Sequence, residues 1–133
     1  MVLPGADSIK SAYQRVLKSK AADFVCLSTG YEAVIGEWYD QEFEPKLFSG
    51  AIKTREVVAD TTGNRSYGAK KDGVKNQARY LSSSAESDLI LADDFMAIVS
   101  FNPASPYAVV IEDPAIVTSA RVWFDAIWAS AAR

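Results

Sequence analysis

The chain has 133 residues, enough for one domain with a hydrophobic core but not for two. Its formal charge of −3 gives no sign of the concentrated basic surface that nucleic-acid binding requires. The sequence contains no histidine, which removes the commonest general base and metal ligand, and its single cysteine excludes an internal disulfide.

Apolar periodicity predicts a helix near the N-terminus, followed by a buried strand. Asp7 or Ser8 is a candidate cap, and apolar side chains recur from Ile9 to Leu17 at the spacing of one helix face. The apolar stretch 24–27 predicts a strand that is covered on both faces. A second helix is expected from about residue 31, with a break at Pro45 because proline cannot continue the hydrogen-bond ladder of a helix, and a short further helix is expected through Phe48.

The second half of the chain predicts a meander and a final helix. Residues 52–60 and 77–81 are expected to form strands, with a short helix around 65–71 between them. Residues 87–101 predict a hairpin with Asp93 and Asp94 in its turn, followed by a strand at 107–112. Asp113 and Pro114 are typical of the cap and first position of a long helix. The pattern predicts an α/β fold over residues 1–133, a single-domain mixed sheet flanked by helices.

No residue pattern identifies a catalytic centre. Cys26 lies inside the first predicted strand with no histidine to generate its thiolate, so we expect a buried structural residue. Six carboxylates fall near predicted strand ends: Asp60, Asp88, Asp93, Asp94, Glu112 and Asp113. A Mg²⁺-dependent hydrolase using Asp88, Asp94 and Asp113 stays open as an alternative. Because turns and helix caps explain each of these carboxylates, we expect neither a metal nor a cofactor.

Several segments, in their order and spacing, together resemble one family. VLPGADSIKSAYQRVLKSKAADFVCLS, LFSGAIKTREVVAD and SDLILADDFMAIVSF resemble successive elements of the phospholipase D-like regulatory domain of TrmB-type transcriptional regulators. The family's G-x-x-x-I helix is matched by Gly5 and Ile9, and its I-x-x-R strand by Ile52 and Arg55. The resemblance implies a phospholipase D-like α/β fold.

The phospholipase D-type motif that the hairpin resembles lacks its reactive groups. Its histidine and lysine positions hold Ser87 and Leu89, while its aspartate position holds Asp94. Because that reaction needs a histidine nucleophile, the resemblance implies a domain that is not an enzyme and that senses a small-molecule effector or dimerises. DNA contact is implied only through an N-terminal helix-turn-helix domain, which this sequence does not include.

A small-molecule site would be expected at the carboxyl ends of the first two strands, where open α/β sheets place their ligands. Ser28, Thr29 and Asp60 are the expected polar contacts there, with Arg55 as an anion partner if its strand directs it to the site.

The final helix carries more apolar side chains than one face accommodates. Val122, Trp123 and Trp128 are therefore expected at a homodimer interface, and an interaction module acting through Trp123 and Trp128 is a third alternative. No segment has the length of a bilayer span or the pattern of a signal peptide, so we expect a cytoplasmic protein without membrane contact.

Overall fold

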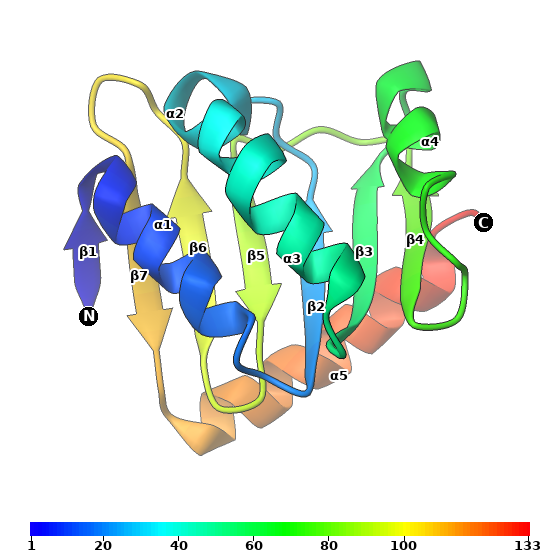
Figure 1. Ribbon diagram of the computed structural model, residues 1–133. Coiled ribbons are helices and arrows are strands. Elements are labelled where there is room, and N and C mark those ends of the chain that lie inside the picture. Colours follow the sequence, from blue (N-terminus) through cyan, green and yellow to red (C-terminus); the bar gives the residue numbers. More distant parts are fainter.

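A seven-stranded mixed sheet with helices on both faces forms the protein, in a computed structural model that describes residues 1–133 (Figure 1). The strands are β1 Val2–Pro4, β2 Ala21–Cys26, β3 Lys53–Ala59, β4 Asn76–Leu81, β5 Ser87–Leu91, β6 Met96–Ser100 and β7 Tyr107–Ile111. The helices are α1 Gly5–Val16, α2 Tyr31–Trp38, the π-helix η1 Tyr39–Phe43, α3 Glu44–Ser49, α4 Thr62–Gly68 and α5 Pro114–Ser130. The predicted fold class is confirmed.

Two kinds of strand pairing meet in the middle of the sheet, whose order is β1-β7-β6-β5-β2-β3-β4. Strands β2, β3 and β4 are parallel because helical segments connect them, whereas β5, β6 and β7 form an antiparallel meander. Strands β2 and β5 are antiparallel, with Val25 opposite Leu89. The amino end of β5 therefore lies beside the carboxyl end of β2.

The two faces of the sheet carry separate hydrophobic cores. The larger core lies under α1, α2 and α3 and includes Phe24, Phe43 and Ile90, while the smaller one lies under α5 and includes Val57 and Phe124. Figure 1 shows α1 to α3 in front of the sheet and α5 crossing behind it. This double coverage explains why β2 is almost entirely apolar.

The first helix begins earlier than predicted. Gly5 has a φ of +85°, a conformation that favours glycine, and its N–H donates to the carbonyl oxygen of Pro106 at 2.8 Å. This turn joins α1 to the short edge strand β1, which pairs with β7 and which the sequence did not predict. Asp7 lies inside the first turn and makes no capping hydrogen bond, so the predicted cap is wrong.

The short helix predicted through Phe48 is confirmed as α3, but the break predicted at Pro45 is wrong. Helices α2, η1 and α3 follow one another without interruption from residue 31 to residue 49. The π-helix shifts the hydrogen-bond register, so Pro45 falls in the first turn of α3, where its missing N–H removes no bond.

The predictions for the hairpin and the last helix are confirmed. Strands β5 and β6 pair in register from Ser87 opposite Ser100 to Leu91 opposite Met96. The Asp113 carboxylate accepts a hydrogen bond from the N–H of Ala115 at 2.8 Å and caps α5. None of the helices combines the length and the apolar character that crossing a bilayer requires.

Candidate functional site

A cavity of about 830 Å³ opens at the carboxyl ends of β2 and β3, on the face of the sheet that α1 to α3 cover. This volume falls within the range of roughly 300–1,000 Å³ that is typical of small-molecule sites. Residues of α2, η1 and α3 form one wall, and residues of α4 form another. Six aromatic side chains line it: Tyr13, Phe24, Tyr31, Tyr39, Phe48 and Tyr67.

A hydrogen-bonded network built on Glu56 of β3 forms part of the lining. The Tyr67 hydroxyl donates to both carboxylate oxygens of Glu56, at 3.2 and 3.1 Å, and the Tyr39 and Tyr67 hydroxyl oxygens are 3.3 Å apart. Glu56 also contacts the ammonium of Lys71, and both side chains are almost completely buried. The Lys71 ammonium lies 5.0 Å from the ring centroid of Phe48 and 4.8 Å from that of Tyr67.

The direction of this network follows from its proton count. The single hydroxyl proton of Tyr67 is directed at Glu56, so the bond between the two phenols requires Tyr39 to donate. The Tyr39 oxygen therefore offers only acceptor lone pairs to a ligand. Burial raises the pKa of both phenols well above 10, so neither ionises near neutral pH.

Asp88, at the amino end of β5, is the second buried carboxylate of the cavity. It is 3 % exposed, and its Oδ1 accepts a hydrogen bond from the N–H of Ser28 at 3.2 Å. Burial raises its pKa from the usual 3.8 to about 6, although the bond from Ser28 acts in the opposite direction. Burial also raises the pKa of the neighbouring Cys26 thiol, with further increases from the charges of Asp88 and Glu56, so Cys26 stays protonated.

The structure brings only part of the predicted ligand set together. Ser28 and Thr29 line the cavity, as expected from their place after β2. Asp60 does not line it, because its carboxylate is held by the Arg65 guanidinium through bonds of 2.8 and 3.0 Å. Those bonds lower the pKa of Asp60.

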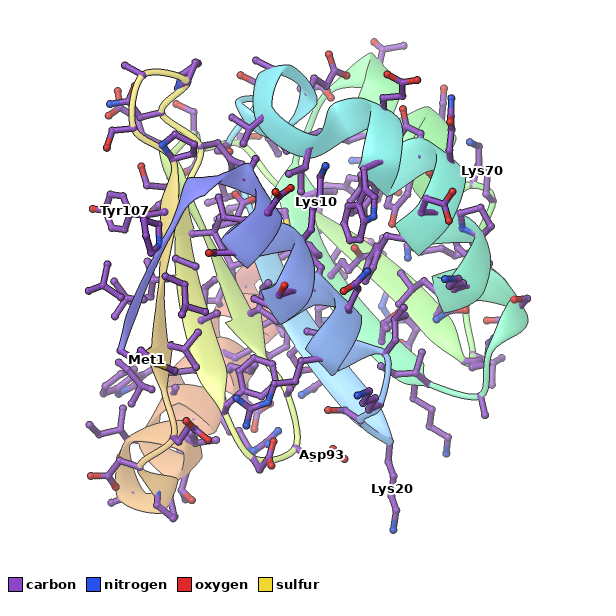
Figure 2. The ribbon with its side chains drawn as sticks, turned by 60° about the vertical axis from the view of Figure 1, so that its left-hand side comes forward. Met1, Lys10, Lys20, Lys70, Asp93 and Tyr107 are labelled. Carbon is purple, nitrogen blue, oxygen red and sulfur yellow. The ribbon has the colours of Figure 1, made fainter.

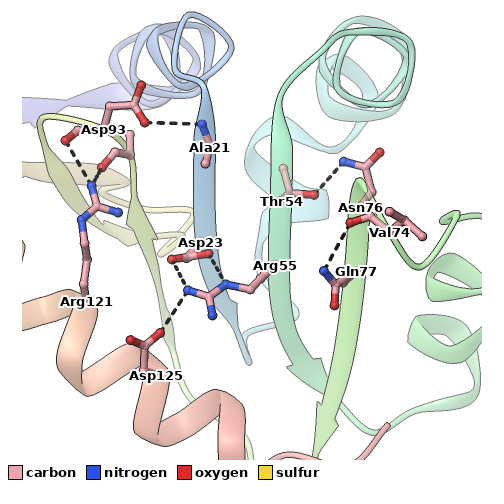
Figure 3. Close-up of polar contacts among 11 residues, drawn as sticks. Ala21, Asp23, Thr54, Arg55, Val74, Asn76, Gln77, Asp93, Arg121 and Asp125 are labelled. Atoms are coloured by element: carbon pink, nitrogen blue, oxygen red, sulfur yellow. Dashed lines mark hydrogen bonds and ion pairs between the residues drawn. The ribbon is translucent and has the colours of Figure 1, made fainter.

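Arg55 lies on the opposite face of the sheet and is not part of the cavity (Figure 3). Its guanidinium donates two hydrogen bonds of 2.9 Å to Asp23 and one of 3.1 Å to Asp125 of α5. The physical reason is strand alternation, since Glu56 faces the cavity and its neighbour in β3 must then face α5. The predicted role of Arg55 as an anion partner there is therefore wrong.

The three carboxylates considered for a Mg²⁺ site do not come together. Asp88 is at the amino end of β5, whereas Asp94 is in the turn at the other end and Asp113 precedes α5. No three acidic or thiol side chains converge closely enough to hold a metal ion. Figure 2 shows this separation. Asp93, which precedes Asp94 in the turn, lies near Lys20 at one end of the sheet, whereas Lys70, which lines the cavity, lies towards the other end.

The predicted interface residues of α5 have different surroundings. Val122 and Trp123 are 64 % and 58 % exposed. Trp128 is half-buried instead, with its ring stacked on Phe124 at 6.1 Å between centroids and the Arg79 guanidinium 4.4 Å from its centroid.

Sequence reasoning missed the residues that give the cavity its character. Glu56, Tyr39, Tyr67 and Lys71 were not candidates, and Asp88 was considered only for a metal. The position of Glu56 inside a predicted strand could have identified it. Side chains alternate between the two faces of a strand, and a charged side chain on a covered face needs a buried partner.

The fold is thus a mixed α/β sheet with a ligand-sized cavity at the carboxyl ends of two parallel strands. No protein-family model matches the sequence, and no curated protein matches it. Among solved structures, one similar chain is TrmBL2, an archaeal chromatin protein whose structure shows a novel mode of DNA binding. The TM-score is 0.66 at 17% identity, over 99% of this chain and 52% of that one. This chain therefore spans about half the length of TrmBL2.

A second similar structure is NucT from Helicobacter pylori, with a TM-score of 0.74 at 10% identity over 99% of this chain and 96% of that one. Sequence identities this low show likeness of fold alone. The fold is similar to that of part of TrmBL2, in line with the fold that the resemblance to TrmB-type regulators implied.

Proposed function

We propose that this chain is a non-catalytic, effector-sensing domain related to TrmB-type regulators, and that its effector binds in the cavity between Glu56 and Asp88. The observation that carries the proposal is the cavity itself, with its volume of about 830 Å³ and its place at the carboxyl ends of β2 and β3. Open α/β sheets bind their ligands at this edge.

Two features support a binding role rather than catalysis. Acyl or phosphoryl transfer through a covalent intermediate needs an activated nucleophile, and the Cys26 thiol is held in its protonated form by burial. The phenols of Tyr39 and Tyr67 are likewise held neutral. DNA binding is not part of the proposed function, because the formal charge of the chain is −3 and a nucleic-acid interface needs clustered cations.

Binding is testable by thermal unfolding in the presence of panels of cationic, neutral and anionic metabolites. A compound at 100 times its Kd stabilises the folded state by about 2.7 kcal/mol, which raises the Tm of a domain of this size by roughly 10 °C. We expect at least one panel to contain such a compound. No stabilisation by any compound contradicts the proposal.

A matched pair of variants assigns the binding to the cavity. Thr29→Trp places a large side chain at an exposed position of the lining, and Thr118→Trp makes the same change at an exposed position of α5. The first variant is expected to abolish the stabilisation and the second to retain it. Steady hydrolysis of bis-p-nitrophenyl phosphate by either purified variant or by the wild type contradicts the non-catalytic part.

The proposal includes pairing of two copies through α5. Val122 and Trp123 are adjacent, large, apolar and more than half exposed, and aromatic residues of this kind are enriched in interfaces. Trp128 is left out of the proposed interface, because Phe124 and Arg79 already cover its ring.

A further inference from the structure

Most of the charged side chains that line the cavity are acidic. Five carboxylates line it: Glu32, Asp40, Glu44, Glu56 and Asp88. Lys70 is the single cationic residue of the lining, and its ammonium is 3.6 Å from Glu44. The negative charge of Glu56 is compensated by the ammonium of Lys71, a residue that does not line the cavity. Three carboxylates therefore remain without an ion-pair partner.

Asp88 is the most informative of these three, because burial makes an uncompensated charge unfavourable. Its side chain lines the cavity, is almost fully buried and has no cationic side chain within ion-pair distance. Its hydrogen-bond donors are uncharged groups, namely the N–H and hydroxyl of Ser28 and the thiol of Cys26, so none of them supplies a positive charge. A buried carboxylate in this position is stabilised by a positive charge that enters the cavity.

The uncharged side chains of the lining also favour a positively charged ligand. The Tyr39 oxygen offers acceptor lone pairs because its proton is committed to Tyr67. The rings of Tyr31 and Tyr39 are tilted against each other by 58° with their centroids 5.3 Å apart, and the faces of such rings attract cations. An anion would instead meet unpaired carboxylates and no free cationic side chain.

We propose that the ligand of this cavity is a small organic cation, an amine or ammonium group on an apolar or aromatic frame, whose positive charge is bound by Asp88 and the tyrosine rings. This inference rests on the proposed function and adds the charge of the ligand to it. Glu32 and Asp40, which are exposed members of the lining, attract the same cation to the mouth of the cavity.

Three compounds that share a 4-hydroxyphenyl ring and differ in the charge of the terminal group test the proposal by isothermal titration calorimetry: tyramine, neutral tyrosol and anionic 4-hydroxyphenylacetate. Spermidine and choline extend the cationic set. We expect a cation to bind, and tyramine to bind at least tenfold more tightly than tyrosol, with 4-hydroxyphenylacetate weakest. Equal affinities, or the reverse order, overturn the proposal.

Variants locate the charge that selects the cation. Asp88→Asn is expected to weaken tyramine binding about tenfold and to leave tyrosol binding unchanged, because the amide keeps an acceptor for Ser28 but loses the charge. Asp125→Asn removes the same charge on the opposite face and is expected to change neither affinity. If Asp88→Asn does not fold, Asp40→Asn at the exposed mouth is expected to weaken tyramine binding selectively. Equal losses for tyramine and tyrosol overturn the proposal.

Failure of this inference is distinguishable from failure of the proposed function. A neutral or anionic compound whose binding is abolished by Thr29→Trp, together with no binding by any cationic probe, overturns the cationic ligand and leaves the effector-sensing role. No binding by any member of the three panels overturns both.

Discussion

At the scale of single residues, the surroundings of two aspartates near strand ends have opposite effects on their pKa values. Asp60 is exposed and paired with the Arg65 guanidinium, which lowers its pKa. Asp88 is buried without a cationic partner, and burial raises its pKa to about 6. The sequence places both beside a strand end and cannot separate them, because the difference depends on which face of the sheet each residue meets.

The raised pKa of Asp88 predicts a pH dependence of stability. Its folded-state pKa of about 6 lies above the unfolded value of 3.8, so the folded state is favoured below pH 3.8 and this advantage is lost as pH rises through 6. Asp88→Asn removes this linkage. Relative to the variant, the wild type is expected to lose about 2 kcal/mol of unfolding free energy between pH 4 and pH 7.

Urea denaturation at several pH values measures this difference. Asp125→Asn, which alters an exposed carboxylate on α5, serves as the control and is expected to run nearly parallel to the wild type. A constant gap between Asp88→Asn and the wild type across this pH range contradicts the assignment.

Arg55 is predicted to act through stability and not through ligand binding. Arg55→Met leaves the Asp23 carboxylate, which is 7 % exposed, without its bidentate partner. We expect the unfolding free energy to fall by about 2 kcal/mol, less than for a fully buried pair because the guanidinium is partly exposed. Chemical denaturation measures the loss, and an unchanged ligand affinity is expected beside it. A selective loss of ligand affinity would return Arg55 to the binding site.

At the scale of elements, local sequence patterns predicted what depends on local structure. The Asp113-Pro114 start of α5 and the 87–101 hairpin were predicted because a cap and a tight turn are set by adjacent residues. β1 was missed because its three residues are ordered only by pairing with β7, more than 100 positions away. Pro45 was misjudged because the π-helix before it, which makes room for the proline, leaves no periodic signal.

The cap of α5 provides a prediction at this scale. Asp113→Ala removes the acceptor for the N–H of Ala115 and is expected to lower the unfolding free energy by about 1 kcal/mol. Asp94→Ala is the matched control, because Asp94 is exposed and forms only a long ion pair with Arg15, at 3.7 Å. Its expected effect is below about 0.5 kcal/mol. Thermal or urea unfolding distinguishes the two, and equal effects contradict the capping role.

At the scale of the whole molecule, the two faces of the sheet have different roles. The face under α1 to α3 carries the cavity, while the face under α5 holds the ion pairs of Arg55 and the second core. The edge of the sheet that bears the cavity was predicted from topology alone, and Ser28 and Thr29 with it. Glu56, Tyr39 and Tyr67 come from three different elements, and only the packing of η1 and α4 against β3 brings them together.

The assembly state gives a prediction for the exposed side of α5. Trp123→Glu places a charge in the proposed interface and is expected to convert a dimer into a monomer in sedimentation velocity runs, with an unchanged circular dichroism spectrum. Ser84→Glu, in the exposed loop between β4 and β5, is the control and is expected to leave the dimer intact. A wild-type protein that sediments as a monomer at every concentration contradicts the pairing.

A crystal structure of the protein grown with tyramine would show directly whether the cavity binds an organic cation at Asp88. We expect density for the compound in the cavity at the carboxyl ends of β2 and β3, with its amine within about 3.5 Å of the Asp88 carboxylate and its ring against Tyr39. Density for the compound beside Arg55 on the α5 face, with the cavity occupied by solvent alone, would contradict it.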